Sequence, residues 1–105
     1  MIEAIFTVTE QMVCGFRISG HADFAEQGSD IVCAAVSSAA YMTANTITEV
    51  QSLRADITEE DGILQVILSP QEAAAAQEIL NGLLLHLNAL SEQYQEYIKV
   101  VISEV

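Results

Sequence analysis

The sequence has 105 residues, which fits one domain, and 51% hydrophobic residues are enough to build a core without disulfides. Fifteen acidic residues against three basic ones give a net charge of −12, which argues against nucleic-acid binding and against anionic membranes. We find no run long and apolar enough to span a bilayer, and the two cysteines predict no disulfide framework. The first residues lack a basic region before an apolar run, so we expect a cytoplasmic protein with reduced thiols.

Two strands are predicted at the start of the chain, over residues 2–8 and 12–19, where apolar and polar residues alternate. The short connection between them favours a hairpin. Because Cys14 shares the face of Phe16 and Ile18, we expect it in the core.

A helical pattern follows, from Asp30, a favourable N-cap residue, to about Val50, with β-branched residues that weaken its far end. Residues 54–60 and 63–68 are then predicted as two strands. The dipeptide Asp61-Gly62 between them is the strongest hairpin signal in the chain.

Ser69-Pro70 marks the start of a second helix, predicted over residues 70–92, with leucines at helical spacing along one wide face. Residues 97–104 are predicted as the last strand. The element order is therefore ββαββαβ. This order predicts an α/β (α+β) two-layer sandwich, one sheet packed by two helices, in a single domain of residues 1–105.

Two residues of this framework can carry chemistry. His21 ends the second predicted strand, directly after Gly20, and Cys33 is the third residue of the helix that Asp30 caps. A thiol at a helix N-terminus lies near unpaired N–H groups and the positive end of the helix dipole, which lowers its pKa. The same N–H groups could stabilise an oxyanion, His21 could act as the base, and Asp30 could cap the helix or orient His21.

Other polar residues are weaker candidates. Ser37 lies one helical turn after Cys33 and could hydrogen-bond the sulfur or a substrate. Gly20 and Gly28 bracket residues 22–27, which we expect to form a mobile loop over the site. The two cysteines and two histidines lack the close-paired spacing of a zinc site, so we expect no metal.

From the residues alone, three alternatives stay open. Cys33 could be a small buried apolar residue without chemistry. The chain could instead be a non-catalytic acidic module that docks on a basic partner. It could also be a redox sensor, although no partner thiol is evident if Cys14 is in the core.

The segment Gly20-His21-Ala22, followed by Gly28-x-Asp30-Ile31-Val32-Cys33-Ala34-Ala35-Val36-Ser37, resembles the ribosomal-processing cysteine protease family, called Prp, of Firmicutes and related bacteria. The resemblance extends over essentially the whole chain in length and element order. It implies a cofactor-free endopeptidase and a homodimer. It also implies that Cys33 is the nucleophile and His21 the general base, with Asp30, Ser37, Gly20 and Gly28 in support.

Proteins of this kind remove a short N-terminal extension from large-subunit ribosomal protein twenty-seven, after a bulky apolar residue, so the resemblance implies a basic ribosomal protein precursor as the peptide substrate. The net charge of −12 suits that partner, because opposite charge speeds encounter. The same charge would suit the alternative, a non-catalytic module that docks on a basic ribosomal protein or assembly factor.

Overall fold

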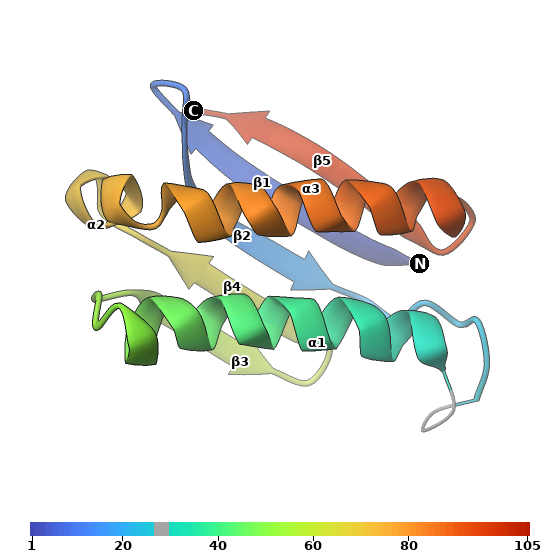
Figure 1. Ribbon diagram of the computed structural model, residues 1–105. Helices are drawn as coiled ribbons and strands as arrows, with labels where there is room; N and C mark the ends of the chain where they lie inside the picture. The colour runs from blue at the N-terminus through green and yellow to red at the C-terminus, as the bar shows by residue number, and fades with distance from the viewer. Residues whose placement is uncertain (27–29) are drawn as a thin grey trace.

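Five strands form one mixed sheet in the computed structural model, which describes residues 1–26 and 30–105 (Figure 1). The strands are β1 (Ile2–Thr9), β2 (Met12–Ser19), β3 (Asp56–Glu60), β4 (Ile63–Ile67) and β5 (Ile98–Glu104). Their order across the sheet is β3-β4-β2-β1-β5, and only the pair β1 and β5 is parallel.

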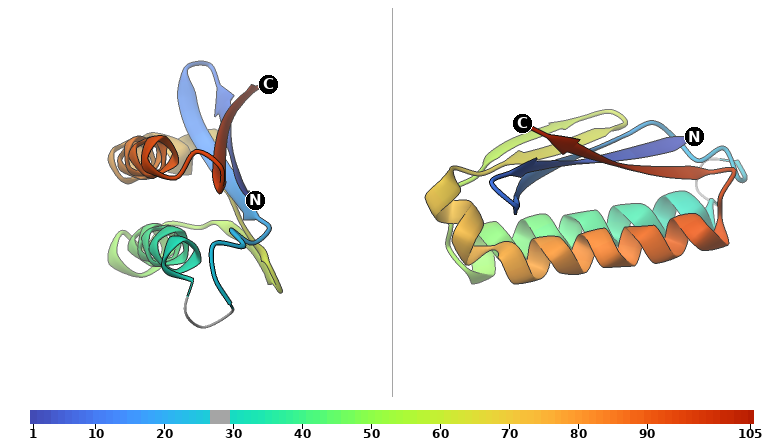
Figure 2. Two further views of the ribbon diagram at one scale, coloured as in Figure 1. Left: turned by 90° about the vertical axis from the view of Figure 1, so that its right-hand side faces the viewer. Right: turned by 90° about the horizontal axis from the view of Figure 1, so that it is seen from above.

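The helices cover one face of this sheet, so the molecule has two layers (Figure 2). They are α1 (Ile31–Asn45), α2 (Pro70–Ala75) and α3 (Gln77–Gln93). The α+β fold and the Asp61-Gly62 hairpin are confirmed, and the predicted order ββαββαβ holds except that two helices stand in place of the last one. The prediction of one helix over residues 70–92 is wrong, because α2 and α3 are separate helices.

Gln77 explains the break between α2 and α3. At the junction, Ala76 leaves the helical conformation, with φ −102° and ψ 7°. The Gln77 side chain there donates to the Ala73 carbonyl at 2.8 Å, and it bonds both the N–H (3.0 Å) and the carbonyl (2.6 Å) of Val13 in β2. The contact between Gln77 and the sheet therefore interrupts the helix at a position where local helix propensity favours its continuation.

The far end of α1 also changes its form, as its β-branched residues predict. The Thr43, Thr46 and Thr48 hydroxyls each donate to the carbonyl four residues back. Residues Thr46–Val50 then form one wider π-helical segment, η1.

By length and composition, residues Ile31–Val50 are long and apolar enough to cross a membrane, so the expectation that no such run exists is wrong. Core helices of soluble proteins share these properties. Here, one side of the helix packs into the core between the two layers, through five apolar residues that are at least 95% buried: Val32, Val36, Ala40, Ala44 and Ile47.

A β-bulge in β2 corrects the expected alternation of this strand. The register between β1 and β2 shifts between Thr7, opposite Gly15, and Val8, opposite Val13. Cys14 is the extra residue and is only half-buried, although it packs against the core, whereas Val13 is buried. The prediction that Cys14 shares the fully buried face of Phe16 and Ile18 is therefore wrong in its register.

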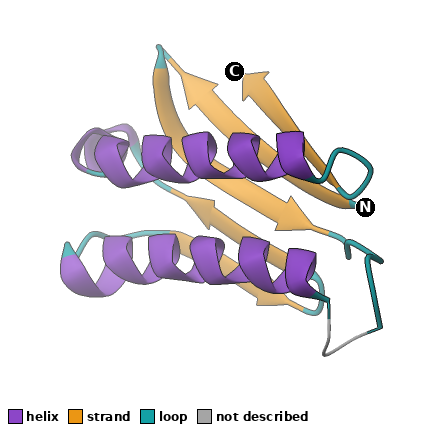
Figure 3. Cartoon of the chain, turned by 45° about the vertical axis from the view of Figure 1, so that its right-hand side comes forward, coloured by secondary structure: helices purple, strands orange, loops and turns teal. Residues whose placement is uncertain are grey.

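Several segments meet at one end of the two layers (Figures 1 and 3). The carboxyl end of β2 and the first residue of the chain lie there, beside the start of α1 and the turn between β3 and β4. Candidate site residues from distant parts of the sequence therefore lie together.

Candidate active site

Gly20 ends β2 in a conformation that other residues rarely adopt. Its φ is +88°, and a Cβ atom added there would lie only 2.5 Å from the Met1 carbonyl oxygen. Its N–H donates to the Gly62 carbonyl at 3.0 Å. The backbone can therefore leave the sheet sharply at this residue, and the next residue, His21, projects from the strand end.

The His21 imidazole lies against Gly62, in the turn between β3 and β4. A Cβ atom at Gly62 would be 3.3 Å from His21 Nε2. His21 is exposed, whereas its neighbour Ala22 is buried and anchors the chain at this point. The hairpin turn thus leaves space for the ring and supports one side of it.

Asp30 caps α1, as predicted. Its Oδ1 accepts hydrogen bonds from the N–H groups of Val32 and Cys33, both at 3.0 Å. Its Oδ2 accepts from the N–H of Phe24 at 3.1 Å. The bond from the Cys33 N–H lowers the pKa of the Asp30 carboxyl below its usual 3.8, and the other N–H donors act in the same direction.

These bonds correct one expectation about the helix start. The N–H groups beside Cys33 are not unpaired, since a cap carboxylate already accepts from those of Val32 and Cys33. An oxyanion at this position would have to share the Cys33 N–H with Asp30 or use other donors. Because both Asp30 oxygens accept from backbone N–H groups, capping is the role that the geometry supports for this residue.

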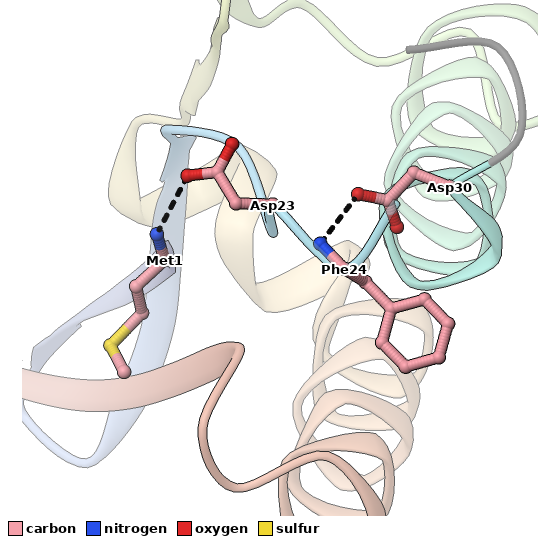
Figure 4. A network of polar contacts seen from close by, with 4 residues as sticks. All are labelled: Met1, Asp23, Phe24 and Asp30. Atoms are coloured by element: carbon pink, nitrogen blue, oxygen red, sulfur yellow. Dashed lines mark hydrogen bonds and ion pairs between the residues drawn. The ribbon is translucent and has the colours of Figure 1, made fainter. Parts of the chain in front are cut away.

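The segment from His21 to Glu26 is tied down at several points (Figure 4). Asp23 Oδ2 lies 3.9 Å from the N-terminal ammonium of Met1, and the Phe24 N–H reaches Asp30. The Phe24 ring also packs edge-on against Tyr94 and Tyr97, with centroid distances of 5.8 and 5.1 Å. Gly28 lies outside the described residues, and the mobility expected for residues 22–27 stays a prediction.

Cys33 is half-buried, and Ser37 is exposed one turn further along α1. Both line two cavities, and His21 lines the same two. The first cavity, of about 490 Å³, lies on the loop side and is also lined by Asp23 and Asp30. The structure therefore brings together five of the predicted site residues, because Gly20 lines the second cavity.

The second cavity, of about 170 Å³, extends from Cys33 toward the sheet, and we call it the sheet-side cavity. The sequence reasoning missed its walls. They come from α1, β1, β2, β4 and the end of β3 with the turn after it, because the sheet order places these segments together. Most of the side chains that line it are apolar, among them Ile18, Val36, Ala40, Ile63 and Leu64.

Among residues 1–26 and 30–105, no three His, Cys, Asp or Glu side chains form a group that could hold a metal ion. His86 lies apart from Cys33, exposed in a groove between α1 and α3.

Comparison with known proteins decides the family. Residues 1–99 match the model of the family described as cysteine protease Prp. The chain belongs to the cysteine protease Prp family. It is 34% identical to the ribosomal processing cysteine protease Prp of Staphylococcus aureus, over 95% of this chain and 97% of that protein. The identity to the Bacillus subtilis Prp is 28%, over 84% of each chain.

A crystal structure of the Staphylococcus aureus Prp, in complex with a covalently linked product peptide, has the same fold. Its TM-score is 0.91 at 33% identity, covering 98% of this chain and all of that one. The present chain is therefore a cysteine protease, and Prp membership decides against the non-catalytic docking module.

Proposed function

We propose that Cys33 is the nucleophile of this protease and His21 its general base. The observation that carries this assignment is that the two side chains, from the end of β2 and the start of α1, line the same two cavities. A half-buried thiol beside an exposed imidazole suits acyl transfer, because the peptide reaches both groups from solvent.

The reaction proceeds through a thioester. The Cys33 sulfur attacks the scissile carbonyl carbon, and His21 takes the thiol proton and passes it to the leaving amine as the C–N bond breaks. His21 then removes a proton from water, which attacks the thioester carbonyl. The carboxylic acid product leaves, and the proton returns to the Cys33 sulfur.

The other predicted residues support this pair. Asp30 fixes the first turn of α1, and hence the Cys33 backbone, through its bonds to the Val32 and Cys33 N–H groups. Ser37 lines both cavities and can hydrogen-bond the substrate. Gly20 turns the chain so that His21 projects from the sheet. The role of Gly28 rests on its motif position alone.

The substrate that we propose is the basic precursor of large-subunit ribosomal protein twenty-seven, which loses its N-terminal extension during ribosome maturation. Two relatives are named ribosomal processing proteases, and the net charge of −12 favours encounter with a basic protein. The bulky apolar residue before the cleaved bond would enter the sheet-side cavity, since apolar side chains from α1, β2 and β4 line it beside the polar side chains of Ser37 and Glu60.

We further propose a cytoplasmic homodimer that needs no cofactor and binds neither nucleic acid nor membrane directly. A cytoplasmic location would bring the enzyme to newly made ribosomal proteins. Light scattering coupled to gel filtration tests the dimer, and a monomer mass at micromolar concentration would overturn it.

Intact-mass spectrometry of the full-length ribosomal protein tests the activity. The precursor is incubated with this protein and, in parallel, with the Cys33→Ala variant. We expect loss of one defined N-terminal peptide with the unmodified protein only. An unchanged precursor mass in the presence of folded enzyme would overturn the proposed substrate.

A further inference from the structure

One tyrosine lines the sheet-side cavity two helical turns after Cys33. Cys33, Ser37 and Tyr41 follow one another at four-residue spacing on α1, so they share one face of the helix, and all three line this cavity. The Tyr41 side chain is 42% exposed. It therefore stands at the rim, with one part against the cavity and one part in solvent.

The partner of Tyr41 comes from the edge of the sheet. Glu59 in β3 pairs with Leu64 in β4, and Leu64 pairs with Ile18 in β2. Residues paired in this way lie on the same face of a sheet. Glu59 therefore extends the row formed by Ile18 and Leu64, two apolar residues of the cavity wall, by one strand toward solvent.

The Tyr41 hydroxyl meets the Glu59 carboxylate across the layers. Hydrogen bonding to that carboxylate raises the pKa of Tyr41 above its usual 10.0, and partial burial and the negative charge of Glu59 act in the same direction. The bond connects the helix that carries Cys33 to an edge strand whose five residues are all exposed. It holds the ring over the rim of the cavity.

We infer that Tyr41, held in place by Glu59, is a specificity-determining residue that closes the subsite for the apolar side chain before the cleaved bond. This inference rests on the proposed function. The ring supplies an apolar wall where α1 and β3 would otherwise leave a gap to solvent. Its hydroxyl is satisfied by Glu59, so the ring presents its carbon atoms to the substrate.

Peptidyl chloromethyl ketones test this inference without the ribosomal protein. Two probes differ only in the residue before the reactive group, Phe or Ala. In each reaction the Cys33 sulfur displaces chloride and forms a thioether. The ratio of the two second-order inactivation rate constants, Phe over Ala, measures the preference for a large apolar side chain. If Tyr41 only stabilised the fold, its substitution would leave this ratio unchanged.

We expect Tyr41→Phe to lower the Phe-over-Ala ratio about three- to tenfold, the effect of one lost hydrogen bond that positions the ring. Tyr41→Ala should lower it about tenfold or more, because the wall itself is removed. Glu59→Ala should match Tyr41→Phe, and Glu59→Gln, which keeps an acceptor, should recover most of the preference. Combining Tyr41→Phe with Glu59→Ala should have no further effect.

Asp56→Ala is the matched control, since it removes the same charge from the same strand at a position that alternation places on the opposite face of the sheet from Glu59. The rate of alkylation by iodoacetamide, which needs no subsite, should be unchanged in the Tyr41 and Glu59 variants.

Ratios for Tyr41→Phe and Glu59→Ala equal to that of the unmodified protein would overturn the inference. Equal rates with both probes in the unmodified protein would overturn it as well. Discrimination between the probes without cleavage of the ribosomal precursor would leave this subsite in place and refute the proposed substrate instead.

Discussion

The two cysteines of the chain are both half-buried, yet their surroundings differ. Cys14 is the extra residue of a β-bulge, and its sulfur lies 3.5 Å from the Thr7 carbonyl oxygen and 3.4 Å from the Thr9 hydroxyl. Cys33 begins a helix, lines two cavities and has His21 beside the same cavities. Partial burial therefore does not separate a structural thiol from a candidate nucleophile.

What separates the two thiols is the element that carries each of them. The bulge directs Cys14 toward groups of its own hairpin, the Thr7 carbonyl and the Thr9 hydroxyl. The start of α1 is held by Asp30 and faces a strand end and a hairpin turn from other parts of the chain. The predictions below test this contrast.

The largest effect is expected from removing each sulfur in turn. Cys33→Ala should lower the cleavage rate by about 10⁴-fold or more, as loss of a nucleophile does in other proteases. Cys14→Ala should keep the rate within about twofold and cost about 1 kcal/mol of stability, typical of a point substitution. Single-turnover cleavage and urea unfolding of both variants measure the two effects. Equal losses of activity would remove the contrast.

The rate of alkylation by iodoacetamide should also differ between the two cysteines. We expect Cys33 to be alkylated at least about tenfold faster than Cys14 at neutral pH, because accessibility and a neighbouring base favour thiolate chemistry. His21→Ala should slow the reaction of Cys33 and leave that of Cys14 unchanged. Peptide mapping by mass spectrometry over time follows both sites. Faster labelling of Cys14 would contradict the assignment.

The caps of α1 and α2 provide a matched pair of substitutions. Asp30→Ala removes the acceptor for the Cys33 N–H and should lower kcat/KM about tenfold, since small displacements of reacting groups are costly. Ser69→Ala removes the acceptor for the Glu72 N–H and should cost about 1 kcal/mol of stability without loss of activity. Cleavage assays with thermal unfolding compare the two. Full activity in Asp30→Ala would exclude a positioning role.

Salt should weaken encounter with a basic substrate. With a net charge of −12, raising ionic strength from about 0.05 to 0.5 M should lower kcat/KM several-fold, because the Debye length shrinks to a few ångströms. A short uncharged peptide serves as the control and should show no comparable change. A salt-independent rate for the basic precursor would argue against electrostatic steering.

The smallest effect concerns acid stability. The pKa of Asp30 is lower in the folded chain than its usual 3.8, so its stabilising contribution is present above that value and is lost as pH falls through the folded pKa. The melting temperature of Asp30→Asn should therefore fall less between pH 5 and about pH 2 than that of the unmodified protein. Parallel slopes would show that other carboxyl groups control acid unfolding.

Local sequence signals predicted much of this fold. The alternation in residues 2–8, the Asp61-Gly62 turn and the Asp30 cap each depend on neighbours within a few residues, and all three are confirmed. The predictions failed where a contact between residues far apart in the sequence overrides the local preference of the chain. Gln77 bonds to Val13 from 64 positions away and ends a helix that its own neighbours would continue.

The sequence by itself determined the order of the strands, the helix start at Asp30 that precedes Cys33 and the acidic charge, since these follow from side-chain periodicity, backbone capping and composition. It also contained the motif that identifies the family. Only the tertiary structure decided which elements adjoin Cys33, because strand order across a sheet depends on long-range pairing. That pairing put Gly62 against His21 and joined Glu59 to Tyr41, contacts that no local pattern predicts.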